Sequence, residues 1–384
     1  MIKKTSLRLS ASLILGCLPS SLALAQSAGF DTVAPHAVIM DSETGVVLFE
    51  KDARRPIAPA SMTKILTAEI VFEAIRAGRI TMDTEFKVSE EAWRRGGAKS
   101  GSSTMFLKLG SSVRVEDLLR GVIIQSGNDA CIVLAEGLAG SETAFADMMT
   151  THARSIGLES VTFRNSTGWP DPEHRISTYD LAKLGQRSVA RYPEFYSLYS
   201  EKSFTWNGIT QANRNPLLKQ FTGADGLKTG HTKVSGYGLV GSAKRGDDRR
   251  IIVLNGLESK GQRRDEAVRV MKAAFDSFAA YKLYEANEII GTVDLYMGTE
   301  DTVDAVVTQN VSVGLYHPDR PKLKTQMRYK EVAAPVAKGD VIAELIVSEP
   351  GKTERVVPLV AKKDVPRLSA LGRAMRSLKT KIGG

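Results

Sequence analysis

The stretch RPIAPASMTK, residues 55–64, opens the first long apolar segment of the chain. Apolar residues continue at helical spacing and Gly78 follows them, so the pattern predicts a buried helix over residues 61–77 with a glycine stop. Ser61 and Lys64 lie three positions apart, on one face of that helix. A serine hydroxyl becomes a nucleophile when a base removes its proton, and a lysine amine can do this if burial or nearby positive charge keeps it neutral.

Two further polar motifs follow this pair along the chain. Ser126-Gly127-Asn128 comes after an apolar run and offers a hydroxyl and a carboxamide, which can relay protons and hold a substrate amide. Lys228-Thr229-Gly230 offers a cation, a hydroxyl and a residue without a side chain, which would let a peptide lie along an edge strand. Taken singly, all three motifs are weak. On its own, the first is better explained by a serine helix cap with a solvated lysine, and the second by a helix-start turn.

The order of the three motifs along the chain makes them more informative together than singly. Ser-x-x-Lys, Ser-x-Asn and Lys-Thr-Gly in this sequence resemble the motif set of the penicillin-recognising serine enzymes. The surrounding stretches are similar to the exported D-alanyl-D-alanine carboxypeptidases, the low-molecular-weight penicillin-binding proteins, over residues 30–280. The stretches that carry this resemblance are HAVIMD (36–41), RPIAPASMTK (55–64), GVIIQSGNDA (121–130) and GLKTGHT (226–232).

The resemblance implies a role for each polar residue of the first two motifs. Ser61 would attack the carbonyl between two D-alanines and form an acyl-enzyme, with Lys64 as general base. Ser126 would pass a proton to the leaving D-alanine, and Asn128 would hold the substrate amide. The backbone N–H groups of Ser61 and His231 would stabilise the oxyanion.

The resemblance also implies that the third motif binds the terminal carboxylate of the substrate. Lys228 would lie near the proton-relaying serine, Thr229 would bind the terminal carboxylate, and Gly230 would leave room for the peptide. An arginine after the next strand often assists in this family. An ungapped count indicates Arg263, with Arg264 as the alternative, and either could instead be a solvated charge at a helix start.

The distribution of charge excludes a nucleic-acid binder. The chain of 384 residues is 42% hydrophobic and 25% charged, as is ordinary for globular proteins. Of the formal net charge of +9, residues 1–25 contribute +3 and residues 365–384 contribute +5. The remaining chain is nearly neutral, so a broad basic face is not expected. The other histidines show no metal-ligand spacing and no Gly-rich phosphate loop occurs, so we expect neither a metal nor a cofactor.

The first 25 residues form a predicted secretory signal peptide. A basic start, a short apolar run and the pattern Ala23-Leu24-Ala25 are typical of such a signal. A lipoprotein box around Cys17 is a weaker alternative. Signal removal would leave Cys131 as the single cysteine, in an apolar helical stretch where a buried side chain is expected rather than a nucleophile. The sequence thus predicts an exported, periplasmic protein.

The expected fold class is α/β (α+β). Residues 37–49 predict a β-hairpin, residues 113–200 are mostly helical, residues 236–242 and 250–254 suggest strands, and residues 265–278 suggest a helix. By resemblance, residues 26–285 would form a catalytic domain with an antiparallel sheet and a helical subdomain. Residues 287–364 carry short β-branched runs and predict a small β-sandwich.

The last segment, residues 365–384, predicts an amphipathic helix on a membrane surface. Pro366 can start the helix and Asp364 can cap it. Five apolar residues fall within one arc of about 80°, and the segment carries five cations without an acid. It is too short and too charged to span a bilayer, which indicates peripheral attachment to the inner membrane. The alternative is that the apolar stripe docks onto the protein's own core. The five apolar residues are Leu368, Leu371, Met375, Leu378 and Ile382.

The function implied by the resemblance is removal of the terminal D-alanine from peptidoglycan pentapeptides, by an enzyme that β-lactams acylate. A class A β-lactamase shares the motifs, but the chain lacks the Glu-x-x-Leu-Asn box that activates its deacylating water. A D,D-endopeptidase stays open, as do the third peptide residue and the oligomeric state. A non-catalytic scaffold would have no need of Ser61, Lys64, Ser126 and Lys228 together.

Overall fold

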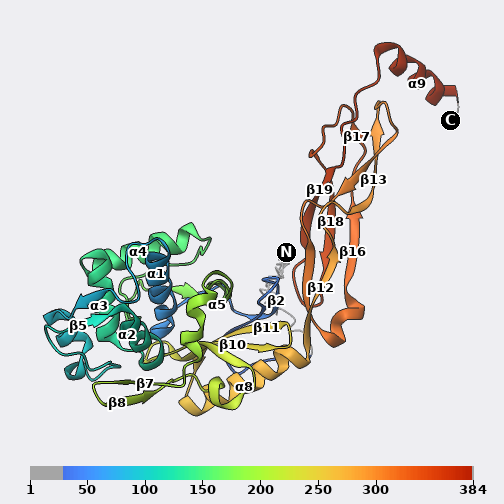
Figure 1. Ribbon diagram of the computed structural model, residues 1–384. Coiled ribbons are helices and arrows are strands. Elements are labelled where there is room, and N and C mark those ends of the chain that lie inside the picture. Colours follow the sequence, from blue (N-terminus) through green and yellow to red (C-terminus); the bar gives the residue numbers. More distant parts are fainter. Residues whose placement is uncertain (1–28, 383–384) are drawn as a thin grey trace, which may run out of the picture.

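The structure is a computed structural model that describes the backbone of residues 29–382 and the side chains of residues 29–376 (Figure 1). An α/β domain (residues 29–277) is followed by an elongated β module (residues 278–369) and a terminal helix. The predicted signal peptide at 1–25 lies outside the described residues. Among the described residues, no helix is both long and apolar enough to cross a membrane.

The α/β domain is built on a five-stranded sheet in the order β2-β1-β11-β10-β9. All four pairings are antiparallel, which confirms the predicted hairpin and the two predicted strands. β9 lies at one edge, so one side of its backbone is open to an added chain. The strands are β1 His36–Asp41, β2 Val47–Lys51, β9 Ala224–Thr232, β10 Gly236–Arg245 and β11 Asp248–Leu257.

Both faces of this sheet are covered. Ala37 and Ile39 of β1 pack in the core shared with helix α8, Lys260–Asp276, whereas Val38 and Met40 pack in the larger core that includes helix α5, Thr178–Arg191. The alternation follows the two-residue repeat of a strand. The sheet is therefore a central layer with an apolar core on each face.

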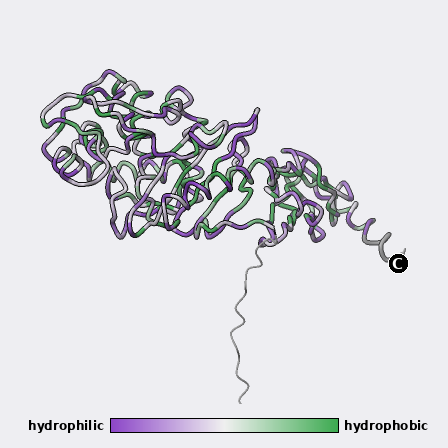
Figure 2. Tube along the Cα trace, turned by 90° about the horizontal axis from the view of Figure 1, so that it is seen from below, coloured by the Kyte–Doolittle hydropathy of each residue, from purple (hydrophilic) through white to green (hydrophobic). Residues whose placement is uncertain are grey.

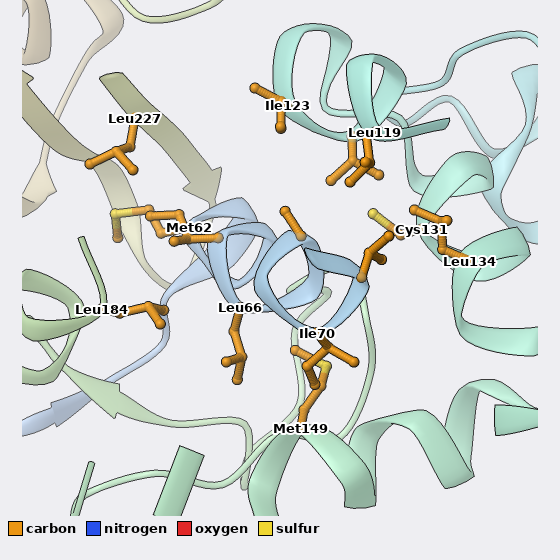
Figure 3. Packing of buried hydrophobic residues seen from close by; sticks show 14 of the residues in the cluster. Met62, Leu66, Ile70, Leu119, Ile123, Cys131, Leu134, Met149, Leu184 and Leu227 are labelled. Carbon is orange, nitrogen blue, oxygen red and sulfur yellow. The ribbon is translucent and has the colours of Figure 1, made fainter. Parts of the chain in front are cut away.

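The predicted first helix is present, but its first turn is a 3₁₀ turn. This turn, η1, spans Ala60–Thr63, and α1 continues over Lys64–Arg76 to Gly78, which has a left-handed φ of 68°. Figure 3 shows α1 at the centre of the apolar core, between Leu227 of β9 and Cys131 of α3. Cys131 is fully buried, as predicted.

Helices α3, α4 and α5 and the turn η4 pack against α1, as the helical pattern over 113–200 predicts. The break in that pattern is wider than Gly168–Pro170, because residues 156–175 form an ordered loop without helix. The helices and turns are α2 Val115–Arg120, η4 Gly121–Gln125, α3 Asn128–Ala139, α4 Glu142–Ser155, α6 Pro193–Tyr196, η5 Ser197–Ser200, α7 Leu217–Gln220, η2 Ala92–Gly96 and η3 Ala98–Ser100. Three small two-stranded pairs are β3 Pro56–Ile57 with β6 Ile176–Ser177, β4 Glu85–Lys87 with β5 Ser112–Arg114, and β7 Ser203–Trp206 with β8 Ile209–Ala212.

The β module contains a two-stranded and a six-stranded sheet around one apolar core. The all-β prediction from 287 is confirmed in kind, but the module's first strand begins earlier, at Phe278. The rings of Phe278 and Tyr316 join Phe30 and Phe49 of the α/β domain in one aromatic cluster. The strands are β12 Phe278–Tyr284, β13 Ile289–Tyr296, β14 Thr302–Val306, β15 Val311–Tyr316, β16 Lys324–Arg328, β17 Val332–Ala333, β18 Val341–Ser348 and β19 Arg355–Ala361, with a 3₁₀ turn η6 His317–Lys322.

Two predicted helix boundaries are wrong. The helix predicted from residue 265 to 278 is α8, which begins at Lys260 because the Ser259 hydroxyl caps the Gln262 N–H. The terminal helix α9 spans Ala370–Ile382 rather than starting at Pro366. Asp364 does not cap it, because its carboxylate accepts a hydrogen bond from Lys338 N.

The residues just before α9 belong to the β module. Val365 is fully buried in the module's core and Pro366 accepts a hydrogen bond from Thr299 N. The Ser369 hydroxyl accepts a hydrogen bond from Gly372 N at 3.2 Å, the usual geometry of a helix N-cap. α9 lies beyond the β module, on the side away from the α/β domain (Figures 1 and 2).

Candidate active site

Ser61 and Lys64 meet where η1 passes into α1. Lys64 Nζ lies 3.0 Å from Ser61 Oγ, so the predicted serine–lysine pair is in hydrogen-bond contact. Ser61 is half-buried, whereas Lys64 is only 1% exposed. The candidate nucleophile is therefore accessible and the candidate base is shielded from water.

Burial sets the proton affinity of Lys64. Loss of hydration is the main cause that lowers the pKa of its amine to about 8, and the positive charge of the nearby Arg214 contributes to this lowering. Two fixed oxygens also orient the amine: Asn128 Oδ1 at 2.8 Å and the Thr167 carbonyl at 2.6 Å. Near neutral pH a useful fraction of Lys64 can then lose its proton, after which Nζ can accept the hydrogen of the Ser61 hydroxyl.

Ser126 stands at the C-terminal end of η4 in a left-handed conformation, with φ 60° and ψ 31°. Such backbone is uncommon for a residue with a side chain and tends to occur at functional sites. Ser126 is 1% exposed. Among the described residues, no hydrogen bond joins its hydroxyl to Ser61 or Lys64, so the structure does not place this serine in direct contact with that pair.

Asn128 begins α3 and connects the pair to the wall of the cleft. Its Oδ1 accepts from Lys64 Nζ, and its Nδ2 donates to Ser102 Oγ at 2.8 Å. The neighbouring Asp129 carboxylate accepts from the backbone N–H groups of Met105 and Leu107 at 2.8 and 3.1 Å. The second motif thus holds both the candidate base and the segment 101–107 beside it.

The third motif lies on the edge strand β9, as predicted. Gly230 packs directly against η1: a Cβ atom there would meet the Pro59 carbonyl oxygen at 2.7 Å and Met62 N at 3.2 Å. A larger residue would therefore displace the turn that carries Ser61. Lys228 is 2% exposed, and burial together with the positive charge of Lys64 holds its pKa well below the ordinary value.

The structure distinguishes the two candidate arginines. Arg263 is 6% exposed and its Nη1 donates to the Gly230 carbonyl at 3.4 Å. Its Nε is buried without a hydrogen-bond partner among the described residues. Arg264 is exposed and pairs with Asp265 at 2.7 Å. Arg263 therefore faces β9 with an unused donor, and Arg264 does not.

His231 follows Gly230 on β9 and is exposed. Its ring stacks on Tyr237, with ring centres 3.8 Å apart, and the Arg263 guanidinium lies over the same Tyr237 ring. These contacts connect the side chain of His231 to Arg263 through the Tyr237 ring.

A cleft of about 500 Å³ contains the predicted nucleophile. Three cations lie at or behind it, namely Lys64, Lys228 and Arg214, and no carboxylate is among its lining residues. Such a cleft favours an anionic ligand. Its lining comprises Ser61, Gly101, Ser102, Ser103, Asn128, Thr167, Gly168, Trp169, Arg214, His231 and Thr232.

Sequence reasoning missed the loop 165–175, which closes this cleft. The Asn165 carboxamide oxygen accepts hydrogen bonds from the backbone N–H groups of Thr167, Gly168 and Trp169. Gly168 has a φ of 82°, and a Cβ atom there would lie 1.9 Å from the Ala60 carbonyl oxygen. The Asn-Ser-Thr-Gly sequence signals a tight turn, but nothing in it indicates contact with a residue about one hundred positions away.

His174, one of the histidines without metal-ligand spacing, belongs to the same loop. It is 2% exposed, and its Nδ1 accepts a hydrogen bond from Arg164 N at 3.2 Å. Its Nε2 therefore carries the hydrogen and donates to Thr63 Oγ1, 2.9 Å away. Burial lowers the pKa of His174 to about 4, so the ring stays neutral. It fixes the residue next to the candidate base.

Comparison with known proteins places this site in a family. Residues 23–258 match the D-alanyl-D-alanine carboxypeptidase family, and residues 278–367 match the C-terminal domain of penicillin-binding protein 5. The D-alanyl-D-alanine carboxypeptidase DacD of Escherichia coli is 36% identical over 96% of this chain and 97% of its own. DacF of Bacillus subtilis is 31% identical over 87% of this chain and 86% of its own.

Solved structures agree with the sequence relatives. Penicillin-binding protein 5 from Haemophilus influenzae matches with a TM-score of 0.72 at 33% identity, covering 89% of this chain and 100% of that structure. DacD from Francisella tularensis matches with a TM-score of 0.76 at 30% identity, covering 91% and 99%. The chain therefore belongs to the D-alanyl-D-alanine carboxypeptidase family of low-molecular-weight penicillin-binding proteins, and it is a serine peptidase.

Proposed function

We propose that Ser61 is the nucleophile of this carboxypeptidase and that Lys64 is its general base. The observation that carries the proposal is the 3.0 Å contact between Lys64 Nζ and Ser61 Oγ, at a buried lysine whose pKa is lowered to about 8. Neutral Lys64 takes the hydroxyl proton while Ser61 Oγ attacks the carbonyl between the two D-alanines. The oxyanion is held by the backbone N–H groups of Ser61 and His231.

The leaving D-alanine is bound beside Thr229, in the second half of β9. Its carboxylate meets Thr229 and Arg263, whose buried Nε has no partner among the described residues. Ser126 relays a proton to the departing amine, with Lys228 beside it, and Asn128 holds the substrate amide. Water then hydrolyses the acyl-enzyme and frees Ser61.

A β-lactam enters the same site, because its carboxylate and strained amide imitate the D-alanyl-D-alanine end. No carboxylate lines the described cleft to activate a deacylating water for the penicilloyl ester. We therefore expect slow release of penicilloate and sustained turnover of D-alanyl-D-alanine peptides. This pattern separates a carboxypeptidase from a β-lactamase.

The experiment is acylation by penicillin, followed by digestion and mass spectrometry. We expect one penicilloyl adduct, on the peptide that contains Ser61, and none in the variant Ser61→Ala. An adduct on another residue would refute the assignment. Digestion of purified muropeptides then identifies the products: free D-alanine for a carboxypeptidase, or separated crosslinked peptides for an endopeptidase.

The same proposal places the enzyme in the periplasm, attached peripherally to the inner membrane by residues 370–384. Leu371 and Met375 of α9 are 72% and 64% exposed, which argues against docking of this stripe onto the protein's own core. An apolar stripe on a cationic helix suits an anionic lipid surface. Leu378 and Ile382, the other α9 residues of that stripe, have side chains outside the described set.

Two cations of α9 are already engaged by the protein. Arg373 donates to the Leu368 carbonyl at 2.7 Å. Arg376 pairs with Asp301 and donates to the Gly298 carbonyl at 3.0 Å, so this side chain holds α9 against the β module. Membrane contact would then come from the exposed apolar residues and the other cations. We expect the mature protein to sediment with vesicles of anionic lipid, less at high salt, and weakly with zwitterionic vesicles. Equal binding to both vesicle types would refute the proposal that the cations of α9 attract anionic lipid.

A further inference from the structure

Glu142 is a carboxylate near the cleft that the proposed mechanism does not use. It stands in the first turn of α4, and its side chain is 11% exposed. Its Oε1 accepts two hydrogen bonds from Ser166, one from the backbone N at 3.1 Å and one from Oγ at 2.7 Å. Ser166 is fully buried, and hydrogen bonds to an ionised acceptor are the strong ones. Glu142 therefore fixes the position of Ser166.

The backbone at Ser166 is also held from the opposite side, by α1. Thr67 Oγ1 donates to the Ser166 carbonyl at 2.7 Å, and Lys64 Nζ donates to the next carbonyl, that of Thr167, at 2.6 Å. The two residues 166 and 167 are thus fixed between α4 and α1. The contact of Glu142 lies one residue away from the oxygen that orients the Lys64 amine.

The second carboxylate oxygen of Glu142 contacts the turn η2. Glu142 Oε2 lies 3.2 Å from Arg95 Nη1. The Arg95 guanidinium lies over the Trp169 ring, 5.1 Å from its centre, and Trp169 lines the cleft. Glu142 therefore contacts the loop directly at Ser166 and reaches Trp169 of the same loop through Arg95.

We propose that Glu142 is a positioning residue of this enzyme, which acts through Ser166 to hold the Thr167 carbonyl against the Lys64 amine. The inference rests on the proposed function, in which Lys64 is the general base. A base must lie within hydrogen-bond reach of the proton that it abstracts, and a misplacement of about 1 Å can cost about 10² in rate. Without the carboxylate, the Ser166 N–H and hydroxyl lose their acceptor and the loop can shift away from α1.

The charge of Glu142 gives this role a second, separate readout. Burial is the main cause that lowers the pKa of Lys64 to about 8, and the negative charge of Glu142 opposes this lowering. Removal of that charge should lower the pKa of Lys64, so that the amine becomes neutral at lower pH. The other charged or titratable groups that act on the amine are Asp129, Arg214, Lys228, His174 and Cys131, whose thiol stays protonated because burial raises its pKa to about 12.

The test compares Glu142→Ala with Glu142→Gln. Alanine removes the acceptor for Ser166, whereas glutamine keeps an acceptor oxygen and removes the charge. For Glu142→Ala we expect the rate of Ser61 acylation by penicillin to fall about tenfold to 100-fold, while the affinity for penicillin before acylation is kept. Glu142→Gln should recover most of the rate above about pH 8, where Lys64 is neutral and the rate reports position alone. Its acylation midpoint should move to lower pH.

Asp147→Ala and Asp147→Asn are the matched controls, because Asp147 is an exposed carboxylate on the same helix and forms no ion pair among the described residues. Both should leave the rate and the midpoint unchanged. Equal rates in Glu142→Ala and Glu142→Gln, or a midpoint that stays fixed in Glu142→Gln, would overturn the inference, while normal acylation of the wild type leaves the proposed function intact. Failure of wild-type acylation at Ser61 would overturn both.

The melting temperature of every variant shows whether it folds. If Glu142→Ala does not fold, Ser166→Ala takes its place, because it removes the hydroxyl that donates to Glu142 and keeps the backbone of the loop. We expect Ser166→Ala to acylate more slowly than the wild type with unchanged affinity for penicillin. A wild-type rate in that variant would overturn the inference.

Discussion

The cleft and the terminal helix use the same kind of side chain in opposite ways. Lys64 and Lys228 are 1% and 2% exposed, and burial lowers the pKa of both. Leu371 and Met375 of α9 are exposed, and the arginines between and after them hydrogen-bond backbone carbonyls of Leu368 and Gly298. In the cleft, burial removes water from the lysine amines and so lowers their pKa. On α9 the cation keeps its charge and serves as a contact.

This difference shows what the two regions require of their surroundings. A lysine that must lose a proton needs a fixed, dry environment, here supplied by Asn128 and the Thr167 carbonyl. A cation that binds a membrane surface needs only to be exposed on the protein. Substitutions should therefore have large effects on catalysis in the cleft, graded by distance from Lys64, and small effects on α9.

The largest effect is expected for Lys64→Arg. Guanidinium keeps the positive charge but stays protonated at all working pH values, so it cannot take the Ser61 proton. Loss of a general base typically costs about 10²–10⁴ in rate, which should appear in the rate of Ser61 acylation by penicillin. A folded Lys64→Arg variant that acylates near the wild-type rate would mean that Lys64 is only structural.

A smaller loss is expected for His174→Leu, which removes the hydrogen bond to Thr63 Oγ1. The turn that carries Ser61 and Lys64 would loosen, and a misplacement of this kind can cost about 10² in rate. We expect the acylation rate to fall while the affinity for penicillin before acylation is kept. His174→Gln, which can still donate to Thr63, should recover most of the rate. Equal loss in both variants would contradict a positioning role.

The parts of the site that could be predicted from the sequence are those formed by residues close together in the chain. The Ser61–Lys64 contact follows from helical spacing, and the position of Lys228, Thr229 and Gly230 on an edge strand follows from the strand pattern. The fold class followed in the same way, from the hairpin, the apolar helix and the β-branched runs of the module.

Other parts of the site depend on contacts between distant segments. The Thr167 carbonyl and His174 carry no pattern that points to Lys64 or Thr63, and they reach these residues because the loop 165–175 folds back over η1. Arg214, between β8 and α7, likewise carries no pattern that points to Lys64. The predicted starts of α8 and α9 were wrong for a related reason. The start of α8 is set by one cap, Ser259, and residues 365–369 follow the core of the β module rather than a helical pattern.

A third prediction concerns pH. Only neutral Lys64 can act as base, and its pKa is lowered to about 8, so acylation at low penicillin concentration should rise with pH and level off above about 8. Arg214 is one cause of that lowering. Removing its charge in Arg214→Gln should raise the pKa of Lys64 and move the midpoint to higher pH. The exposed Arg264→Gln is the matched control. A midpoint that stays fixed in Arg214→Gln would exclude this coupling.

The smallest effect on catalysis is expected from deletion of residues 370–384. The deletion must start after Ser369, because Val365 is buried in the β module and Pro366 bonds Thr299 N. The cleft lies in the α/β domain, so kcat/KM for a soluble peptide should stay within about twofold, a change worth less than the roughly 1.4 kcal/mol of a tenfold effect. Sedimentation with anionic vesicles should be lost. A longer deletion from residue 365 should in addition lower the melting temperature, because it removes a buried valine. If the protein truncated at residue 369 still sediments with the vesicles as well as the intact protein does, α9 is not the membrane anchor. The cations of α9 would then have no role in membrane binding to compare with the role of the buried lysines in the cleft.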